Sequence, residues 1–161
     1  MEKNLKKHSI YLDDIRTPID NKWTVVRSYD EFVDKITEIG LENIELISLD
    51  HDLGYSAMKE YFDNASPNYT LDYNNIEEKT GYDASKWLVN QFYSKFPERI
   101  NMTRIEKKNG KSIIFPLIYV HSHNPIGAHN ICGWINNFLK NEKQPETCVR
   151  VQIEHTVEKN K

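Results

Sequence analysis

Residues 45–49 form a short apolar run that stops abruptly at Asp50, His51 and Asp52, and this junction constrains the fold more than any other part of the sequence. An apolar run of this length is typical of a strand inside a sheet. Three ionisable side chains at its end cannot stay in a dry interior, so they must face water, a cation or a ligand. The sequence therefore predicts a buried strand whose tip is a candidate functional site.

Strand-like segments alternate with amphipathic helices along the chain. This alternation is typical of an α/β protein with a doubly wound, mainly parallel sheet and helices on both faces. Helices are expected to begin near residues 28, 80 and 124. The five expected strands are residues 9–12, 23–26, 45–49, 117–120 and 148–153.

Local signals also predict where two of the helices begin or end. Ser28 followed by Glu31 is a capping box, and Gly40 suits the end of the same helix. Asn124 is the expected cap of the last helix, because Pro125 is readily accepted at a first helical position.

The chain of 161 residues is long enough for one sizeable core, and we expect a single domain over residues 1–161. Residues 55–79 lack a clear period and are too long for a simple connection, so we expect an insertion there. Its tyrosines favour a packed subdomain over a lid that stacks on bases. A hairpin is expected at residues 102–115, since Asn109-Gly110 is a strong turn signal.

Composition argues against some classes of protein. The formal net charge of −3 argues against a broad binding surface for duplex nucleic acid, but a nucleic-acid end or a small nucleotide stays open as a ligand. No apolar run is long enough to span a bilayer, and the basic N-terminus lacks the apolar segment of a signal peptide. The expected location is therefore the cytoplasm, where Cys132 and Cys148 would be free thiols.

Polar clusters follow three of the expected strands. Ligands of open parallel sheets bind outside the carboxyl ends of the strands, so we expect these clusters to lie close together. Three histidines, His8, His129 and His155, are left out of this expected site. The members of the clusters are Asp13 and Asp14, then Asp50, His51 and Asp52, then His121, Ser122, His123 and Asn124.

The four acids Asp13, Asp14, Asp50 and Asp52 would repel one another unless a cation or a positively charged side chain lay among them. A divalent metal meets this need with these residues as ligands. Oxygen ligands favour Mg²⁺ or Mn²⁺, while the neighbouring imidazoles also permit Zn²⁺ or Fe.

Other residues of the clusters suit a phosphate. Arg16 follows Asp13 by three residues and can bind phosphate oxygens through two N–H groups. Ser122 and Asn124 stand at an expected helix start and offer further donors, with His123 between them.

Two histidines and one acid are the expected catalytic residues. His51 would act as general acid or base, and His121 or His123 would be its opposite partner, since imidazole exchanges protons near neutral pH. Asp50 completes this catalytic group.

Four motifs that are well separated in the sequence occur in a specific order. They are Tyr11-Leu12-Asp13-Asp14-Ile15-Arg16-Thr17-Pro18, Ser48-Leu49-Asp50-His51-Asp52-Leu53-Gly54, Thr80-Gly81-Tyr82-Asp83, and His121-Ser122-His123-Asn124-Pro125 with Gly127. In this order they resemble the cyclic-phosphate processing receiver-like family, and the likeness covers most of the chain apart from the insertion and the hairpin. The resemblance implies a receiver-like, flavodoxin-like fold. It also implies a proposed activity on cyclic phosphate ends of RNA or related cyclic phosphates.

The likeness extends to response-regulator receivers, which share this fold. It implies that Asp13 and Asp14 bind Mg²⁺, that Asp50 is the phosphoacceptor, and that Ser122 supplies the neighbouring hydroxyl. The chain departs from receivers after its fifth strand, where Glu154 and His155 stand in place of a lysine. Arg150 lies within that strand and is a poor substitute, which weakens the case for phosphotransfer signalling.

The sequence thus favours a metal-assisted phosphoesterase, an RNA-processing hydrolase whose substrate is a 2′,3′-cyclic phosphate at an RNA end or a cyclic nucleotide. The alternative is a receiver-derived module that binds a phosphorylated ligand or partner without chemistry. No membrane contact is expected, and the oligomeric state is not indicated.

Overall fold

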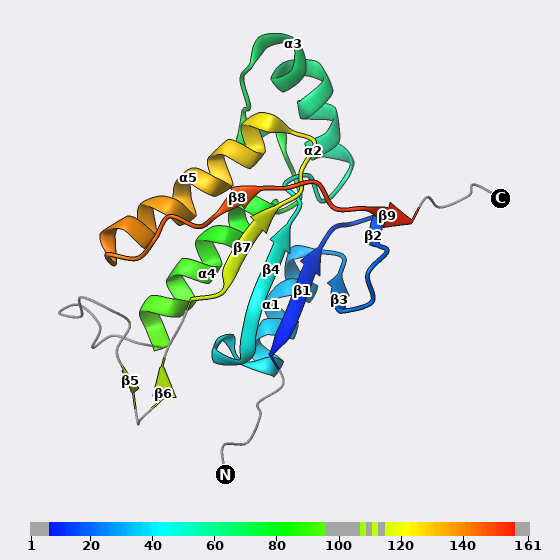
Figure 1. Ribbon diagram of the computed structural model, residues 1–161. Coiled ribbons are helices and arrows are strands. Elements are labelled where there is room, and N and C mark those ends of the chain that lie inside the picture. The colour runs from blue at the N-terminus through cyan, green and yellow to red at the C-terminus, as the bar shows by residue number, and fades with distance from the viewer. Residues whose placement is uncertain (1–6, 96–106, 109–110, 113–114, 157–161) are drawn as a thin grey trace.

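The structure is a computed structural model that describes residues 7–95, 107–108, 111–112 and 115–156 (Figure 1). Its centre is a five-stranded sheet in which all neighbouring strands are parallel. Counted along the chain, the strand order is 2-1-3-4-5, the flavodoxin-like order. The expected α/β fold with a five-stranded parallel sheet is confirmed. In spatial order the strands are β3 (Trp23–Val26), β1 (His8–Leu12), β4 (Ile44–Leu49), β7 (Leu117–Val120) and β8 (Val149–Arg150).

The last strand is shorter than expected. β8 ends at Arg150, whereas the sequence predicted a strand over residues 148–153. The chain then crosses the carboxyl edge of the sheet to β9 (His155–Thr156), which pairs antiparallel with β2 (Thr17–Pro18) (Figure 1). The C-terminal segment therefore lies beside the residues that follow β1.

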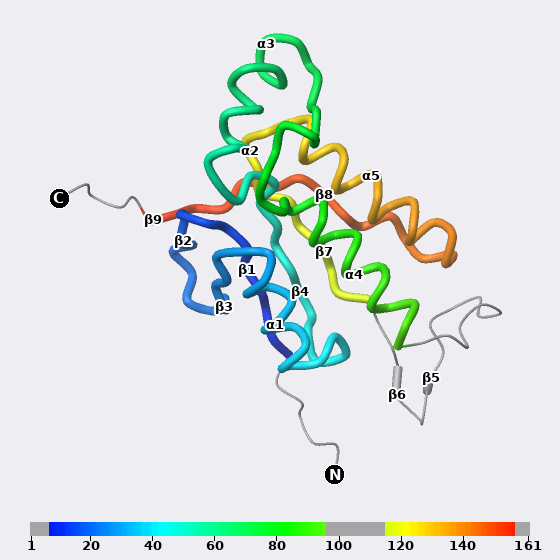
Figure 2. Tube along the Cα trace, turned by 180° about the vertical axis from the view of Figure 1, so that it is seen from behind, coloured from blue at the N-terminus to red at the C-terminus, as the bar shows by residue number. Residues whose placement is uncertain are grey.

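The three long helices α1 (Tyr29–Ile39), α4 (Gly81–Lys95) and α5 (Pro125–Asn141) lie side by side on one face of the sheet (Figures 1 and 2). The expected helices on both faces are not found in the described residues. Each connection from β3 onward moves in the same direction along the sheet, so right-handed crossovers place every helix on the same face. The opposite connection, from β1 to β3, contains only the short strand β2.

The two faces of the sheet differ in chemistry. Leu12 and Leu49 are register partners in β1 and β4 and belong to the hydrophobic core. Tyr11 and Ser48, partners one position earlier, point to the opposite face because side chains alternate along a strand. Both are fully buried, so this second face carries polar groups toward the carboxyl edge.

The expected helix ends are present. Ser28 Oγ accepts the N–H of Glu31 at 3.1 Å, while the Glu31 carboxylate accepts the N–H of Arg27 at 2.7 Å, one residue earlier than a capping box predicts. Gly40 follows α1 with a φ of 90°, and the side chain of Asn124 caps α5. A 3-10 turn, η1 (Leu41–Asn43), leads from α1 to β4.

The insertion lies beyond the carboxyl ends of the strands (Figure 1). Buried Glu60 holds it together, because its carboxylate accepts N–H groups of Asn64, Asp72 and Asn75 at 2.9 to 3.0 Å. This polar centre supports the packed subdomain that the sequence favoured. Its elements are α2 (Tyr55–Glu60), a π-helical turn η2 (Tyr61–Ala65), α3 (Ser66–Asn68) and a 3-10 turn η3 (Tyr73–Asn75).

Of the expected hairpin, the structure describes β5 (Lys107–Lys108) and β6 (Lys111–Ser112), which pair antiparallel. The turn at residues 109–110, and residues 102–106 and 113–114, lie outside the described residues. Within the described part of the chain, each helix is too short or too polar to cross a membrane.

Candidate functional site

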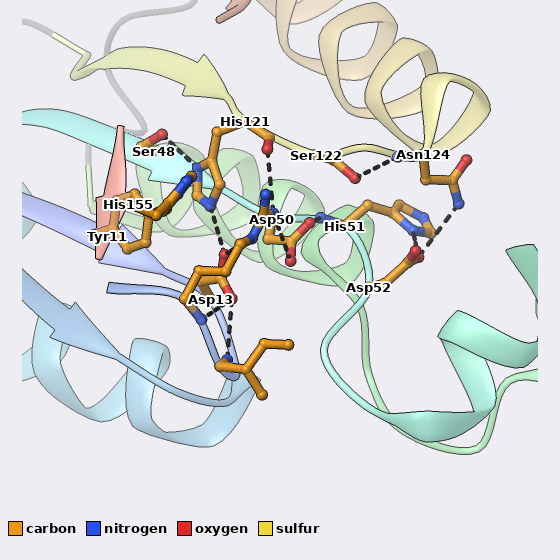
Figure 3. A network of polar contacts seen from close by, with 12 residues as sticks. Tyr11, Asp13, Ser48, Asp50, His51, Asp52, His121, Ser122, Asn124 and His155 are labelled. Atoms are coloured by element: carbon orange, nitrogen blue, oxygen red, sulfur yellow. Dashed lines mark hydrogen bonds and ion pairs between the residues drawn. The ribbon is translucent and has the colours of Figure 1, made fainter. Parts of the chain in front are cut away.

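The three polar clusters meet at the carboxyl edge of the sheet (Figure 3). The backbone ladder continues past the strand ends, since Asp50 N donates to Leu12 O at 2.9 Å and His121 N donates to Leu49 O at 3.0 Å. The residues that follow β1, β4 and β7 are therefore held in register. One side chain from each of the other two clusters, Asp50 and His121, lies close to Asp13.

Asp13 lies at the centre of the site and is fully buried. Its Oδ1 accepts the backbone N–H groups of Ile15 at 3.0 Å and Arg16 at 2.8 Å. Its Oδ2 accepts the Nε–H of Arg16 at 2.8 Å and lies 3.2 Å from His121 Nε2. Burial acts to raise the pKa of Asp13, but the hydrogen bonds from His121 and the backbone outweigh burial and lower it. Asp13 is therefore a carboxylate whose charge acts on the acids around it.

Arg16 lies among the acids. Its Nη2 is 3.3 Å from Asp50 Oδ2 and donates to His121 O at 3.3 Å. Arg27 supports this loop by donating to the backbone oxygens of Asp13 and Arg16 at 3.2 and 2.6 Å. The chain itself thus supplies one positive charge for the acids. A phosphate could reach Arg16 only in competition with these carboxylates.

One arginine does not neutralise all the acids. Burial and then the nearby charge of Asp13 raise the pKa of Asp50 to about 7, against the lowering effect of Arg16. Burial and Asp13 also raise the pKa of Asp14. One carboxylate oxygen from each of Asp13, Asp14 and Asp50 lies within 4.8 Å of the other two. We call these three residues the acid cluster. Hard oxygen donors with excess negative charge fit a divalent cation such as Mg²⁺ or Mn²⁺.

Asp52, the fourth expected metal ligand, is not grouped with the acid cluster in the described structure. Its Oδ1 lies 2.6 Å from His51 Nδ1 and accepts the Nδ2–H of Asn124 at 3.3 Å. His51 Nε2 lies 2.9 Å from the hydroxyl of Tyr73, and that oxygen also accepts the Nδ2–H of Asn130 at 3.0 Å. We call Tyr73, His51 and Asp52 the relay.

The direction of the relay follows from its hydrogen bonds. A carboxylate can only accept, so His51 Nδ1 donates its proton to Asp52. When the imidazole carries no second proton, its other nitrogen is an acceptor, and the hydroxyl of Tyr73 donates to it. This is the order of a carboxylate, an imidazole and a hydroxyl in a catalytic triad.

Two glycines hold His51 in place. A Cβ at Gly81 would lie 1.8 Å from Asp50 O, and a Cβ at Gly127 would lie 2.3 Å from His51 Cγ. Gly81 N also donates to His51 O at 2.9 Å. Only glycine allows α4 and α5 to begin this close to the segment, and His51 is fully buried as a result.

The residues expected to bind phosphate differ in exposure. Asn124 is fully buried, with its Oδ1 capping α5 and its Nδ2 directed at Asp52. Ser122 is also buried; its Oγ accepts the N–H of Asn124 at 3.1 Å, and its carbonyl accepts from Arg150 Nη2 at 2.9 Å. His123 is the exposed member of this group. Asn124 therefore has a structural role that uses both ends of its amide.

A comparison with protein-family models matches the chain to the cyclic-phosphate processing receiver domain over residues 8–137. The chain belongs to this family. No curated protein and no solved structure matched it. The matched span of this cyclic-phosphate processing receiver domain includes the acid cluster and the relay, whereas β8 and β9 lie beyond it.

His155, like Arg150, reaches the site of this receiver domain from outside the matched span. His155 lies in β9, and its Nε2 forms a hydrogen bond with the hydroxyl of Tyr11. His121 stacks on Tyr11 with ring centroids 4.2 Å apart, and its Nδ1 lies 2.7 Å from Ser48 Oγ. Burial lowers the pKa of His121 to about 4, so its imidazole is neutral at neutral pH. One donor atom from each of Asp13, His121 and His155 lies within 4.8 Å of the others.

The sequence did not lead us to expect four residues in the site: Tyr11, Ser48, His155 and Tyr73. Side-chain alternation along the strands would have placed Tyr11 and Ser48 on one face, since they are register partners. His155 follows the last strand expected from the sequence, residues 148–153, so the rule that placed the other clusters at this edge also applied to it. No sequence signal placed Tyr73, because the insertion has no period that positions it over His51.

Proposed function

We propose that this domain is a metal-assisted phosphoesterase that hydrolyses a cyclic phosphate, either a 2′,3′-cyclic phosphate at an RNA end or a cyclic nucleotide. The observation that carries the proposal is that the acid cluster and the relay lie side by side, joined by the peptide between Asp50 and His51. Family membership supports the substrate class. The relay supports acid–base chemistry, which a module that only binds phosphate does not need.

The acid cluster would hold the cation. Its fit rests on three converging carboxylates, two of which have raised pKa values. A bound Mg²⁺ or Mn²⁺ would neutralise charge on the phosphate oxygens and activate a water. It would also replace Arg16 as the counter-charge of Asp13 and Asp50, which frees the guanidinium to bind phosphate.

The relay would take the proton of the attacking water. In the hydrolysis, the water oxygen bonds to phosphorus, one ring P–O bond breaks, and the released oxygen gains the proton that the relay took from the water and returns through the hydroxyl of Tyr73. The oxygen of Tyr73 accepts the proton of the water while its own proton passes to His51 Nε2, and Asp52 stabilises the imidazolium that forms. Burial raises the pKa of Tyr73 to about 12, so its hydroxyl stays protonated at rest. His51, which is fully buried, acts through this hydroxyl.

In this mechanism His121 and Asp50, which the sequence placed in the catalytic group, would not transfer protons. His121 is neutral and both its ring nitrogens have partners, so it orients Asp13. Asp50 has its Oδ2 near Arg16 and serves as a cation ligand.

Turnover of a substrate panel tests the proposal. The panel contains 2′,3′-cyclic and 3′,5′-cyclic nucleotides and an RNA oligomer with a 2′,3′-cyclic end, incubated with Mg²⁺ or Mn²⁺ and analysed by chromatography. His51→Ala and Tyr73→Phe should each lower kcat by about 100-fold or more. His129→Ala, an exposed histidine on α5, is the matched control and should keep full activity. Unchanged turnover in His51→Ala, or no turnover of any substrate, would refute the proposal.

A second candidate function is binding without chemistry. It is favoured by the observation that Arg16 already pairs with Asp13 and Asp50, so the site has an internal counter-charge without a cation. Calorimetry with a cyclic nucleotide, followed by chromatography of the same sample, separates the two functions. Heat of binding with intact ligand supports the module, and product supports the phosphoesterase.

A further inference from the structure

We infer that Asp13, His121 and His155 form a second cation site, suited to a metal that accepts nitrogen ligands, with Zn²⁺ as the first choice. This nitrogen site shares Asp13 with the acid cluster. Its capacity to bind metal stands on the geometry of the three side chains, and its use in catalysis rests on the proposed phosphoesterase function.

The three side chains already have the spacing of metal ligands. Their donor atoms lie within 4.8 Å of one another, and Asp13 Oδ2 is 3.2 Å from His121 Nε2. A tetrahedral Zn²⁺ holds nitrogen and oxygen ligands at about 2.0–2.1 Å, which places two ligand atoms about 3.4 Å apart. A cation could therefore replace the contact between Asp13 and His121 with only a small movement of either residue.

Ser48 allows His121 to change from a hydrogen-bond donor into a metal ligand. Without a metal, Nε2 donates its proton to Asp13, so Nδ1 accepts the hydroxyl proton of Ser48. With a metal on Nε2, the proton moves to Nδ1, and the same hydroxyl oxygen accepts it. A hydroxyl is both donor and acceptor, so this buried contact at 2.7 Å is kept in either tautomer. A partner of this kind orients a ligating imidazole.

β9 ties His155 to the loop that carries Asp13. In the antiparallel pair of β2 and β9, Pro18 lies opposite His155 and Thr17 lies opposite Thr156. The loop between Asp13 and β2 is short, and β2 pairs with β9. Asp13 and His155, two of the three ligands of the nitrogen site, therefore belong to one connected unit. The hydroxyl of Tyr11 gives His155 a further partner inside the site.

The ligand set separates this site from the acid cluster. Two imidazoles and one carboxylate suit Zn²⁺ or Fe²⁺ and leave coordination positions for water or a phosphate oxygen. The acid cluster offers only oxygens, which suit Mg²⁺ or Mn²⁺. Two cations that share the carboxylate of Asp13 would form a two-metal phosphoesterase centre, in which the second cation stabilises the oxygen that leaves phosphorus.

Metal binding to the full-length chain, freed of metal by a chelator, tests the nitrogen site. Calorimetry with Zn²⁺ gives the affinity, and Co²⁺ in place of Zn²⁺ gives a visible absorption band when it has nitrogen ligands in a low-coordinate site. His155→Ala should weaken Zn²⁺ binding at least tenfold and remove the Co²⁺ band. His155→Gln should do the same, and unchanged far-ultraviolet circular dichroism excludes a loss of fold. His129→Ala, exposed on α5, should change neither measurement.

Asp50→Asn separates the two sites, because Asp50 belongs only to the acid cluster. This variant should keep the Co²⁺ band and lose Mg²⁺ binding. The nitrogen site would be overturned if the wild type gave no Co²⁺ band, if His155→Ala bound Zn²⁺ within twofold of the wild type, or if His129→Ala lost as much affinity. All these measurements report binding. A protein with an intact nitrogen site and no turnover would refute the proposed function alone.

Discussion

Replacing Asp50 with asparagine should stabilise the metal-free protein at pH 8 and leave its stability nearly unchanged at pH 4. Asp50 is buried beside the charged Asp13, and its pKa is raised from the ordinary value of 3.8 to about 7. Between these two values the folded protein keeps a proton that the unfolded chain releases. Stability is therefore lost as the pH rises from about 4 through 7, and asparagine, which cannot ionise, avoids this loss.

The size of the effect follows from the difference between the folded and unfolded pKa values. A difference of about 3 pKa units corresponds to about 4 kcal/mol above pH 7, at about 1.4 kcal/mol per unit. The raised pKa already includes the attraction of Arg16, whose Nη2 lies 3.3 Å from Asp50 Oδ2. Asparagine keeps an acceptor for the N–H of His51 and, like the protonated acid, carries no charge. The expected gain at pH 8 is therefore about 4 kcal/mol, or a rise in Tm of about 8–16 °C. At pH 4 the folded wild type holds Asp50 protonated, so the two proteins should differ little in stability.

Thermal unfolding followed by circular dichroism at pH 4, 6 and 8, in the presence of a chelator, measures this pH dependence. Asp34→Asn, on the exposed face of α1, is the matched control and should leave the pH dependence unchanged. Mg²⁺ should raise the Tm of the wild type far more than that of Asp50→Asn, because a cation needs the ionised carboxylate. An equal change in stability at pH 4 and pH 8 would refute the reasoning, since Arg16 would then compensate the buried charge fully.

Three further changes test the packing, the thiols and the acid. Gly81→Ala should destabilise the fold by about 3 kcal/mol or more in urea unfolding, because its Cβ would lie 1.8 Å from Asp50 O, whereas Gly133→Ala, with open space around its Cβ, should stabilise it by about 0.5–1 kcal/mol. The free thiols Cys132 and Cys148 should form a disulfide under mild oxidation, because their Sγ atoms lie 3.7 Å apart. The two positions differ by 16 in the sequence, so the disulfide should raise the free energy of unfolding by about 3 kcal/mol, which mass mapping without reduction and unfolding would show. Acetyl phosphate with Mg²⁺ should leave the intact mass unchanged, because Asp50 is buried, its Oδ1 accepts the His51 N–H, and Glu154 and His155 stand where a receiver has its lysine; an added phosphoryl group would contradict this.

The fold could be predicted where local pattern and burial agree, and not where it depends on strand order. Asn124-Pro125 marked the start of α5 because capping is a local property. Residues 148–153 look like one strand, but β8 lies at an edge of the sheet and the chain soon turns to pair with β2. The helices share one face because of the direction of each crossover, which is unknown until the strand order is known.

The position of the site could be predicted, but not the partner of each charge. The convergence of strand ends placed Asp13 and Asp50 together without any tertiary information. The sequence could not show that Arg16 would turn inward to both acids, or that Asp52 would pair with His51. These pairings depend on side-chain directions in two turns, where neither a helical nor a strand period applies.

Asp50 and His51 are neighbours in sequence but serve different groups, which explains why this junction is so constrained. Asp50 belongs to the acid cluster and His51 to the relay, and the His51 N–H donates to Asp50 Oδ1 at 2.8 Å. Gly81 packs against the carbonyl of Asp50 and donates to the carbonyl of His51, so a change of charge in the acid cluster acts one residue away from the imidazole. A domain that only accepted a phosphoryl group would not need the relay. The relay, completed by Tyr73 from the insertion, is the part that hydrolysis would require, and the insertion is therefore where we expect substrate chemistry to depart from that of receivers.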